Sequence, residues 1–178
     1  VAKSHKIDFA YGLCEVSNKS SVDELYSSAS LARKSIPVNS TDKYLWFNDQ
    51  LKEDQLWERF VEENMEHALE TGELHVYLQP KYSAETRRLG GAEALIRWIN
   101  PDKGFIGPGK FIPIFEKNGF IIPLDRYVWE ETCRAMKSWR EKGYPEIPVS
   151  VNVSRMHIYS DEFVDFIAEL VRKYNIPP

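Results

Sequence analysis

Residues 91–98 read Gly-Ala-Glu-Ala-Leu-Ile-Arg-Trp, and this order predicts a strand with one polar and one apolar face. Because side chains alternate sides along a strand, Glu93, Leu95 and Arg97 share one face. The opposite face carries Ala92, Ala94, Ile96 and Trp98. The strand therefore offers an apolar surface for helices to cover and, on its other side, a carboxylate close to a guanidinium.

Two further segments repeat this alternation. In residues 75–81, Val76 and Leu78 alternate with Tyr77, Gln79 and Lys81. In residues 148–154 the apolar face consists of Val149, Val151 and Val153, and the polar face of Ser150, Asn152 and Ser154. An antiparallel sheet with one solvated face would explain any one of these strands.

Taken together, the three strands favour a barrel whose polar faces point inward. Helical segments lie between the strands and need an apolar surface to cover. If they cover the apolar faces, the polar groups line the inside, where they are costly unless they are paired, bind a metal or meet a ligand. Four side chains therefore form a candidate site for metal and phosphate: Gln79, Glu93, Arg97 and Asn152.

The alternation of strands and helices from residue 75 onward predicts an α/β fold. The expected strands are 75–81, 91–99 and 148–154, and the expected helices are 110–117, 123–142 and 160–174. Upstream, Ser21 and Glu24 have the spacing of a capping box, so a helix is expected from there to Lys34. Short strands are expected on either side of it, at 7–15 and 43–47.

A long helix is expected between these two parts. It begins at Asn48 or Asp49, carries a single apolar stripe, and ends at Gly72, which can adopt the left-handed conformation of a helix end. It either connects two domains or belongs wholly to one core.

The composition excludes several functional classes. A net charge of -4 and a pI near 5.7 give no general attraction to nucleic acid or to anionic membranes, which favours a small ligand. No apolar run reaches the length of a membrane span. Cys14 and Cys133 belong to no metal-binding pattern and are interpreted as small buried residues of a reducing compartment, so we expect a cytoplasmic location.

The run 91–98 resembles the signature of the EAL family of cyclic di-GMP phosphodiesterases, with Glu-Ala-Leu at 93–95. The surrounding residues carry the resemblance: Tyr77-Leu78-Gln79-Pro80, Asn100-Pro101 with Gly104 and Pro108, Phe111-Ile112-Pro113 with Glu116 and Gly119, and Val151-Asn152-Val153-Ser154. Residues 29–34 resemble, over a shorter stretch, the late helix of a GGDEF domain, the diguanylate cyclase fold, with Ser30 where Asp or Asn is usual.

The resemblance implies a division of the chain into three parts. Residues 1–48 would be the C-terminal remnant of a GGDEF-like α+β domain, 49–73 a connecting helix, and 74–178 the N-terminal part of an EAL domain. The EAL part would be a partial (β/α)8-like barrel of the TIM type, whose first strand runs antiparallel to the others. Later motifs of the family have no counterpart before Pro178.

The resemblance also implies an activity and a set of site residues. The ligand would be cyclic di-GMP, hydrolysed to linear pGpG with two divalent ions, Mg or Mn. Glu93 and Asn152 would be catalytic metal ligands, and Arg97 would contact a phosphate. Gln79, Leu95 and Pro108 would complete the substrate-binding pocket. A nucleic acid polymer is not expected as a partner, whereas a homodimer is expected. The whole protein could carry a membrane anchor outside this chain.

Several alternatives remain beside these roles. Arg97 could simply neutralise Glu93, Asn152 could be a turn amide, and Lys81 and Lys110 are interpreted as solvated surface. A degenerate EAL domain would act as a cyclic di-GMP receptor without cleaving it. A barrel glycosidase using Glu93 as acid would need a second carboxylate on a neighbouring polar face, and the sequence offers none there. The chain by itself is expected to be inactive, with an open sheet of about three barrel strands.

Overall fold

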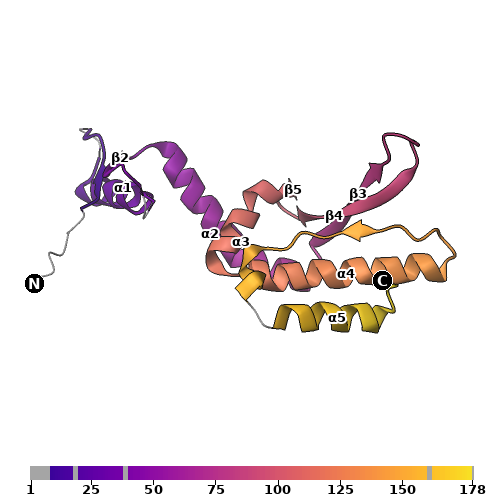
Figure 1. The fold of residues 1–178 in the computed structure, drawn as a ribbon. Coiled ribbons are helices and arrows are strands. Elements are labelled where there is room, and N and C mark those ends of the chain that lie inside the picture. Colours follow the sequence, from indigo (N-terminus) through magenta and orange to yellow (C-terminus); the bar gives the residue numbers. More distant parts are fainter. Residues whose placement is uncertain (1–8, 18–19, 38–39, 160–161, 178) are drawn as a thin grey trace, which may run out of the picture. The chain divides into compact units, whose positions relative to one another are not determined.

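The computed structural model describes residues 9–17, 20–37, 40–159 and 162–177 (Figure 1). The chain divides into two compact units, Val1–Phe60 and Val61–Pro178. The long helix α2 (Asp49–Glu70) crosses this boundary, as a helix with residues in both units.

The first unit pairs two short strands in parallel and places one helix beside them. Strands β1 (Tyr11–Leu13) and β2 (Tyr44–Trp46) are shorter than the predicted segments, of which residues 7 and 8 lie outside the described residues. Helix α1 (Val22–Lys34) begins with the predicted capping box: Ser21 Oγ accepts from the Glu24 N–H, and the Glu24 carboxylate accepts from the Ser21 N–H. Gly12 is required because a Cβ there would lie 1.7 Å from the Ala29 oxygen of α1.

The second unit is built on a mixed sheet. Helix α2 ends before Gly72, whose φ of 76° provides the left-handed turn into the sheet. The strands are β3 (Leu74–Tyr82), β4 (Leu89–Asn100), β5 (Gly104–Ile106) and β6 (Val149–Ser150). β3 and β5 are antiparallel to β4, whereas β6 is parallel to it. The first strand therefore runs antiparallel to β6 as well, as the family resemblance implies.

The predicted helices are present; the ends of the first two are shifted by one or two residues, and residues 160 and 161 at the predicted start of the third lie outside the described residues. A 3-10 turn η1 (Pro108–Lys110) precedes α3 (Ile112–Asn118), and α4 (Ile121–Glu141) follows. A second 3-10 turn, η2 (Arg155–Tyr159), leads to α5 (Glu162–Tyr174). α4 lies between the sheet and α5 (Figure 1).

The two-faced character of residues 91–98 is confirmed. Ala92, Ala94, Ile96 and Trp98 are buried, whereas Glu93, Leu95 and Arg97 are half-buried on the other side. Trp98 is fully buried with Phe111 and Phe115, and its ring centroid lies 5.6 Å and 6.3 Å from theirs. Burial of such large rings dominates the energy of a core, so the apolar face of β4 anchors the second unit.

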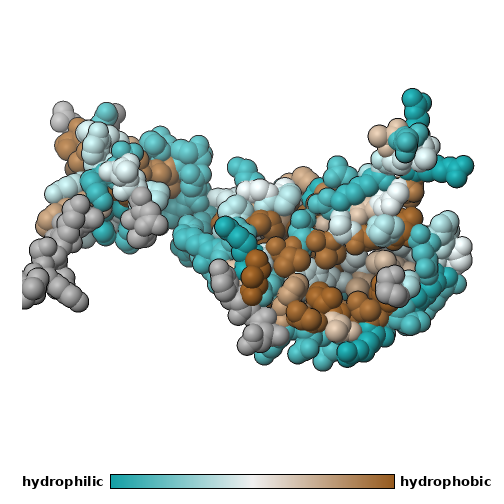
Figure 2. All heavy atoms as spheres, in the orientation of Figure 1, coloured by the Kyte–Doolittle hydropathy of each residue, from teal (hydrophilic) through white to brown (hydrophobic). Residues whose placement is uncertain are grey.

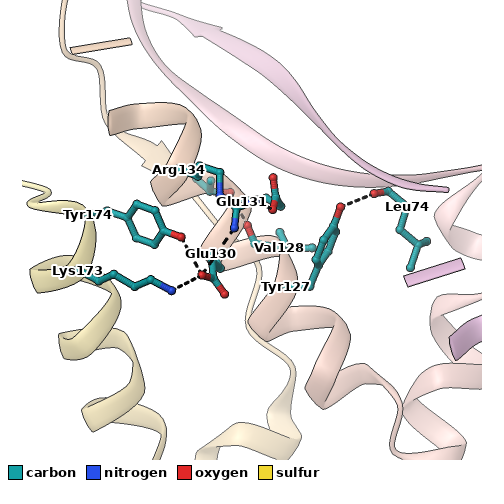
Figure 3. A network of polar contacts seen from close by, with 9 residues as sticks. Leu74, Tyr127, Val128, Glu130, Glu131, Arg134, Lys173 and Tyr174 are labelled. Carbon is teal, nitrogen blue, oxygen red and sulfur yellow. Dashed lines mark hydrogen bonds and ion pairs between the residues drawn. The ribbon is translucent and has the colours of Figure 1, made fainter. Parts of the chain in front are cut away.

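A second apolar cluster joins α4 to α5. Trp129, Leu170 and Tyr174 are buried there, and Val151 packs against them from the segment after β6. Figure 2 shows hydrophobic residues gathered in a band across the visible face of this unit, with hydrophilic residues on either side. At the polar edge of this cluster, the Glu130 carboxylate accepts hydrogen bonds from Lys173 Nζ at 2.6 Å and from Tyr174 OH at 2.7 Å (Figure 3).

The predicted strand 148–154 is wrong over most of its length. Only Val149 and Ser150 form a strand, and Val153 is 45% exposed, so the expected alternation breaks there. The reason is that side chains of α4 take backbone groups of the following residues: Trp129 Nε1 donates to Asn152 O, and the Ser154 N–H donates to Asp125. The short β5 was not among the expected strands.

The sheet remains open among the described residues. Its order is β3-β4-β5 with β6 also on β4, and no described strand pairs β3 with β6. None of the described helices is long and apolar enough to cross a membrane. Cys14 and Cys133 are free thiols and partly buried, and burial raises the pKa of the Cys133 thiol above its ordinary value.

Candidate functional site

The polar face of the sheet is organised around Glu93. In the strand register Glu93 lies opposite Gln79 of β3 on one side and Ser150 of β6 on the other. Paired residues in neighbouring strands have their side chains on the same face. A row of three polar side chains therefore crosses the sheet, and two of the predicted site residues belong to it.

The Glu93 carboxylate has two partners from different segments. Lys81 Nζ lies 3.0 Å from Oε2, and Asn152 Nδ2 donates to Oε1 over 3.4 Å. Lys81 also donates to Ser150 Oγ at 2.8 Å. Hydrogen bonds from Lys81 and then from Asn152 hold the pKa of Glu93 below its ordinary value, so the group is anionic at neutral pH.

The other predicted residues line one pocket beside this carboxylate. The pocket has a volume of about 300 Å³, and Leu95, Arg97, Pro108 and Asn152 are in its wall. Arg97 Nη1 donates to the carbonyl of Ile96 at 2.8 Å. Glu93 is paired with Lys81 and Asn152 instead. The alternative in which Arg97 simply neutralises Glu93 is therefore wrong. The pocket thus adjoins a carboxylate and contains a guanidinium.

Two residues missed by the sequence interpretation, Asp125 and Trp129, hold the segment that carries Asn152, and Asp125 also lies in the pocket wall. The Ser154 N–H donates to Asp125 Oδ2 at 3.0 Å, and Trp129 Nε1 donates to Asn152 O at 3.0 Å. Burial raises the pKa of Asp125, an effect that the Ser154 N–H and the nearby His157 partly offset. The spacing of four residues between Asp125 and Trp129, on one side of a predicted helix, was the available signal.

Lys81 was interpreted as solvated surface, and this is only partly right. Its side chain is 52% exposed, yet its ammonium contacts the central carboxylate. Its place two residues after Gln79 on the same strand face was the sequence signal for this contact.

Glu93 and Asn152 carry side-chain oxygens of the kind that suits a hard divalent cation, although the Asn152 amide turns its nitrogen toward Glu93 in this structure. A carboxylate and an amide carbonyl are ligands of the kind that Mg²⁺ and Mn²⁺ take. The ammonium of Lys81 places a positive charge against Glu93, so this position accepts a cation. No group of three or more His, Cys, Asp or Glu side chains with metal-binding geometry is found in the described part of the chain. Glu93 is therefore not part of a carboxylate- or histidine-rich metal cluster among the described residues.

The second unit is thus an α/β domain whose sheet carries a carboxylate, an amide and a guanidinium on one polar face. The chain belongs to the EAL domain family, whose model matches residues 62–178.

Similar proteins agree with this assignment. The chain is 28% identical over 155 residues to the bifunctional diguanylate cyclase/cyclic di-GMP phosphodiesterase MucR of Pseudomonas aeruginosa, covering 87% of this chain and 23% of MucR. It is 36% identical over 104 residues to the probable cyclic di-GMP phosphodiesterase PdeG of Escherichia coli, covering 58% of this chain and 20% of PdeG.

A solved structure of the PaMucR phosphodiesterase in complex with c-di-GMP superimposes with a TM-score of 0.63 at 32% identity, over 66% of this chain and 48% of that one. The second unit is therefore an α/β domain homologous to cyclic di-GMP phosphodiesterases. The chain spans less than half of this structure and about a quarter or less of MucR and PdeG.

Proposed function

We propose that this chain supplies the first part of a catalytic EAL domain that hydrolyses cyclic di-GMP to linear pGpG. One observation carries the proposal: Glu93 of β4 and Asn152 from the segment after β6 meet within 3.4 Å, beside a pocket lined by Arg97. Glu93 and Arg97 belong to one strand, whereas Asn152 comes from a segment more than fifty residues later. The solved complex of PaMucR phosphodiesterase with c-di-GMP supports the choice of ligand.

Glu93 and Asn152 would hold divalent metal, Mg or Mn, through a carboxylate and an amide oxygen. Such ions, when bound, lower the pKa of a water molecule and stabilise the charge on the attacking and leaving oxygens of a phosphodiester. The contribution of Glu93 is a negative charge at neutral pH, because its pKa is lowered by its partners. Additional ligands would have to come from residues that complete the domain.

The remaining residues would orient the dinucleotide. The Arg97 guanidinium can donate two parallel hydrogen bonds to a phosphate, a geometry that a lysine cannot match. Leu95 and Pro108 are among the apolar residues of the pocket wall. Gln79, opposite Glu93 on β3, would present its amide to the ligand at the same row of the sheet.

The finer architecture is part of the same proposal. We infer a partial (β/α)8 barrel over 74–178, preceded by a connecting helix over 49–73 and a GGDEF-like remnant over 1–48. The 155 residues aligned with the bifunctional MucR exceed the span 62–178, so similarity extends into the residues before 62, which supports the remnant. A cytoplasmic location is proposed with it.

A homodimer is also proposed for the complete protein. Ile158 and Val164 are 71% and 70% exposed, and Val153 is 45% exposed, all close together in sequence. Exposed apolar side chains that gather on one face favour association. A second copy of the chain would cover them.

A receptor that binds cyclic di-GMP without cleaving it is the second candidate, and the Lys81–Glu93 pair favours it. The ammonium at 3.0 Å neutralises the carboxylate that a metal would need. A cation must displace Lys81 before Glu93 can serve as a ligand, and a domain in which this exchange fails would keep only the phosphate-binding groups.

Turnover of cyclic di-GMP by the full-length protein, with Mn²⁺ or Mg²⁺, separates the two candidates. Glu93→Gln is expected to lower the rate by at least about a hundredfold, because it removes an anionic metal ligand worth several kcal/mol in the transition state. Glu169→Gln is the matched control: it makes the same chemical change at an exposed position of α5 and is expected to leave the rate unchanged.

Near-normal turnover in Glu93→Gln would contradict the role of Glu93. Tight binding of cyclic di-GMP by a wild-type protein that forms no pGpG would favour the receptor.

A further inference from the structure

Asn152 lies beyond the part of its segment that the sheet holds. β6 ends at Ser150, and residues 151–154 have no strand partner. A metal ligand has to stay within fractions of an ångström of its working position, and this is usually achieved by hydrogen bonds to the groups behind it. The support for Asn152 must therefore come from something other than the sheet.

Helix α4 provides that support through two side chains. Asp125 and Trp129 are four residues apart and so project from the same side of the helix. Trp129 Nε1 donates to the carbonyl of Asn152, and Asp125 Oδ2 accepts from the N–H of Ser154, both at 3.0 Å. The first hydrogen bond is made to the backbone of Asn152 and the second to the backbone of Ser154, two residues later. Together the two bonds fix the backbone that carries the Asn152 side chain.

Both groups are deep in the unit. Trp129 is 2% exposed and Asp125 is 8% exposed. A carboxylate at this depth costs free energy unless hydrogen bonds compensate for the lost water. Apolar side chains would pack α4 against this segment without the free-energy cost of burying a charge. The buried carboxylate therefore indicates that the segment must be held in one orientation, which a hydrogen bond can fix and apolar packing cannot.

His157 stands behind the carboxylate. Its Nε2 lies 3.2 Å from Asp125 Oδ2, without the alignment of a hydrogen bond, and no other described group bonds it. The ring is 2% exposed and packs against Trp129 and Phe163, with centroids 4.7 Å and 5.7 Å away. The imidazole thus limits the side-chain rotamers that Asp125 can adopt. Because it also packs against Trp129, His157 contacts both of the residues that bind the segment carrying Asn152.

We propose that Asp125 and Trp129 are positioning residues that hold Asn152 beside Glu93, and that His157 holds Asp125 in turn. The inference rests on the proposed function, because it takes Asn152 to be a metal ligand. The strength of metal binding is then set partly by two α4 side chains that bind the backbone next to the ligand.

Calorimetry of Mn²⁺ binding to the full-length protein tests this directly. Asp125→Ala is expected to weaken Mn²⁺ binding by at least about tenfold, as the loss of a group behind a ligand does. Asp125→Asn keeps a side-chain oxygen that can accept the same bond, and should stay within about threefold of the wild type. Trp129→Phe keeps an aromatic ring without the donor and should also weaken binding.

Hydrogen exchange in the metal-free protein gives a second readout. The Ser154 amide is expected to be protected in the wild type and in Asp125→Asn, and to exchange faster in Asp125→Ala. Glu130→Gln is the matched control, because Glu130 adjoins Trp129 on α4 but its partners Lys173 and Tyr174 are on α5. It should lower stability and leave the Mn²⁺ affinity unchanged.

Wild-type Mn²⁺ affinity in Asp125→Ala, in a protein that does cleave cyclic di-GMP, would overturn the positioning role alone. The positioning role would also be overturned if Glu130→Gln lost as much Mn²⁺ affinity as Asp125→Ala at the same loss of stability. A general loosening of the packing would then explain both variants. A wild-type protein with a protected Ser154 amide that neither binds Mn²⁺ nor cleaves the dinucleotide would overturn the proposed function, and with it the role of Asn152.

Discussion

Glu93 interacts with two neighbours that have opposite consequences for a metal. Asn152 donates its amide N–H to the carboxylate and carries an oxygen that could serve as a second metal ligand, whereas Lys81 brings a competing positive charge. The position of Glu93 on a polar strand face could be inferred from alternation alone. The Lys81 contact could not, because a lysine on a predicted strand is in most cases solvated.

Arg97 is the residue whose role separates ligand binding from metal binding. Arg97→Ala is expected to weaken cyclic di-GMP binding by at least about tenfold, because a charge-assisted hydrogen bond contributes roughly 1.5–3 kcal/mol. A guanidinium cannot coordinate a cation, so Mn²⁺ affinity should change little. Calorimetry with each ligand in turn measures both effects.

Arg126→Ala is the matched control for this prediction. It removes the same charge from α4, where the guanidinium lies 3.4 Å from Glu162 of α5. Equal losses of dinucleotide and metal affinity in Arg97→Ala would instead indicate a structural role for Arg97.

Among the secondary-structure elements, helix α4 contacts several different parts of the second unit. Tyr127 OH donates to the carbonyl of Leu74 in β3 at 2.7 Å, and Glu130 faces α5 (Figure 3). Asp125 and Trp129 bind the segment after β6. The sequence predicted the length of this helix from Pro123 and Gly143, but no periodicity shows which of its polar residues bind which partner.

The α4–α5 contact predicts a pH dependence of stability. Hydrogen bonds from Lys173 and then Tyr174 hold the pKa of Glu130 below its ordinary value. A lowered folded pKa means that the stabilisation is present above the unfolded value, about 4.3, and is lost as pH falls through the folded one. The free energy of unfolding should therefore differ between wild type and Glu130→Gln by on the order of 1 kcal/mol at pH 7.

Urea unfolding from pH 7 down to pH 3 measures this difference. It should shrink toward zero on the acid side, because Glu130 is then protonated in both states. A difference that stays constant down to pH 3 would show that the charge of Glu130 contributes nothing.

At the scale of the whole chain, the number of oxygen ligands limits the chemistry. Hard divalent cations take about six or more oxygen ligands, several of them from the protein. The described residues contain no cluster of three or more acidic, His or Cys side chains arranged for a metal, and their sheet is open. Glu93 and Asn152 alone do not hold two metals.

The purified 178-residue chain is therefore expected to form no pGpG from cyclic di-GMP in the presence of Mn²⁺ or Mg²⁺. Chromatographic assay of product measures this, with the Glu93→Gln chain as a blank for contaminating enzyme. Product formed by the wild-type chain and absent from that blank would show that this chain completes a site by itself or through a second copy.

The sequence by itself determined the local features of this protein. Alternation assigned the two faces of residues 91–98, the capping box at Ser21 placed the start of α1, and Gly72 marked the end of α2. Each of these depends on neighbours within a few positions, so the local sequence contains the information. The motif resemblance then indicated the family that the match over 62–178 shows.

Only the tertiary structure decided how the site is held. The predicted strand 148–154 ended at Ser150 because Asp125 and Trp129, more than twenty positions earlier, take the backbone groups of the residues that follow. Lys81 joined Glu93 because β3 pairs with β4 in one particular register. A side chain on a helix can replace a sheet partner only when the fold brings the two together, and strand propensity carries no record of that competition.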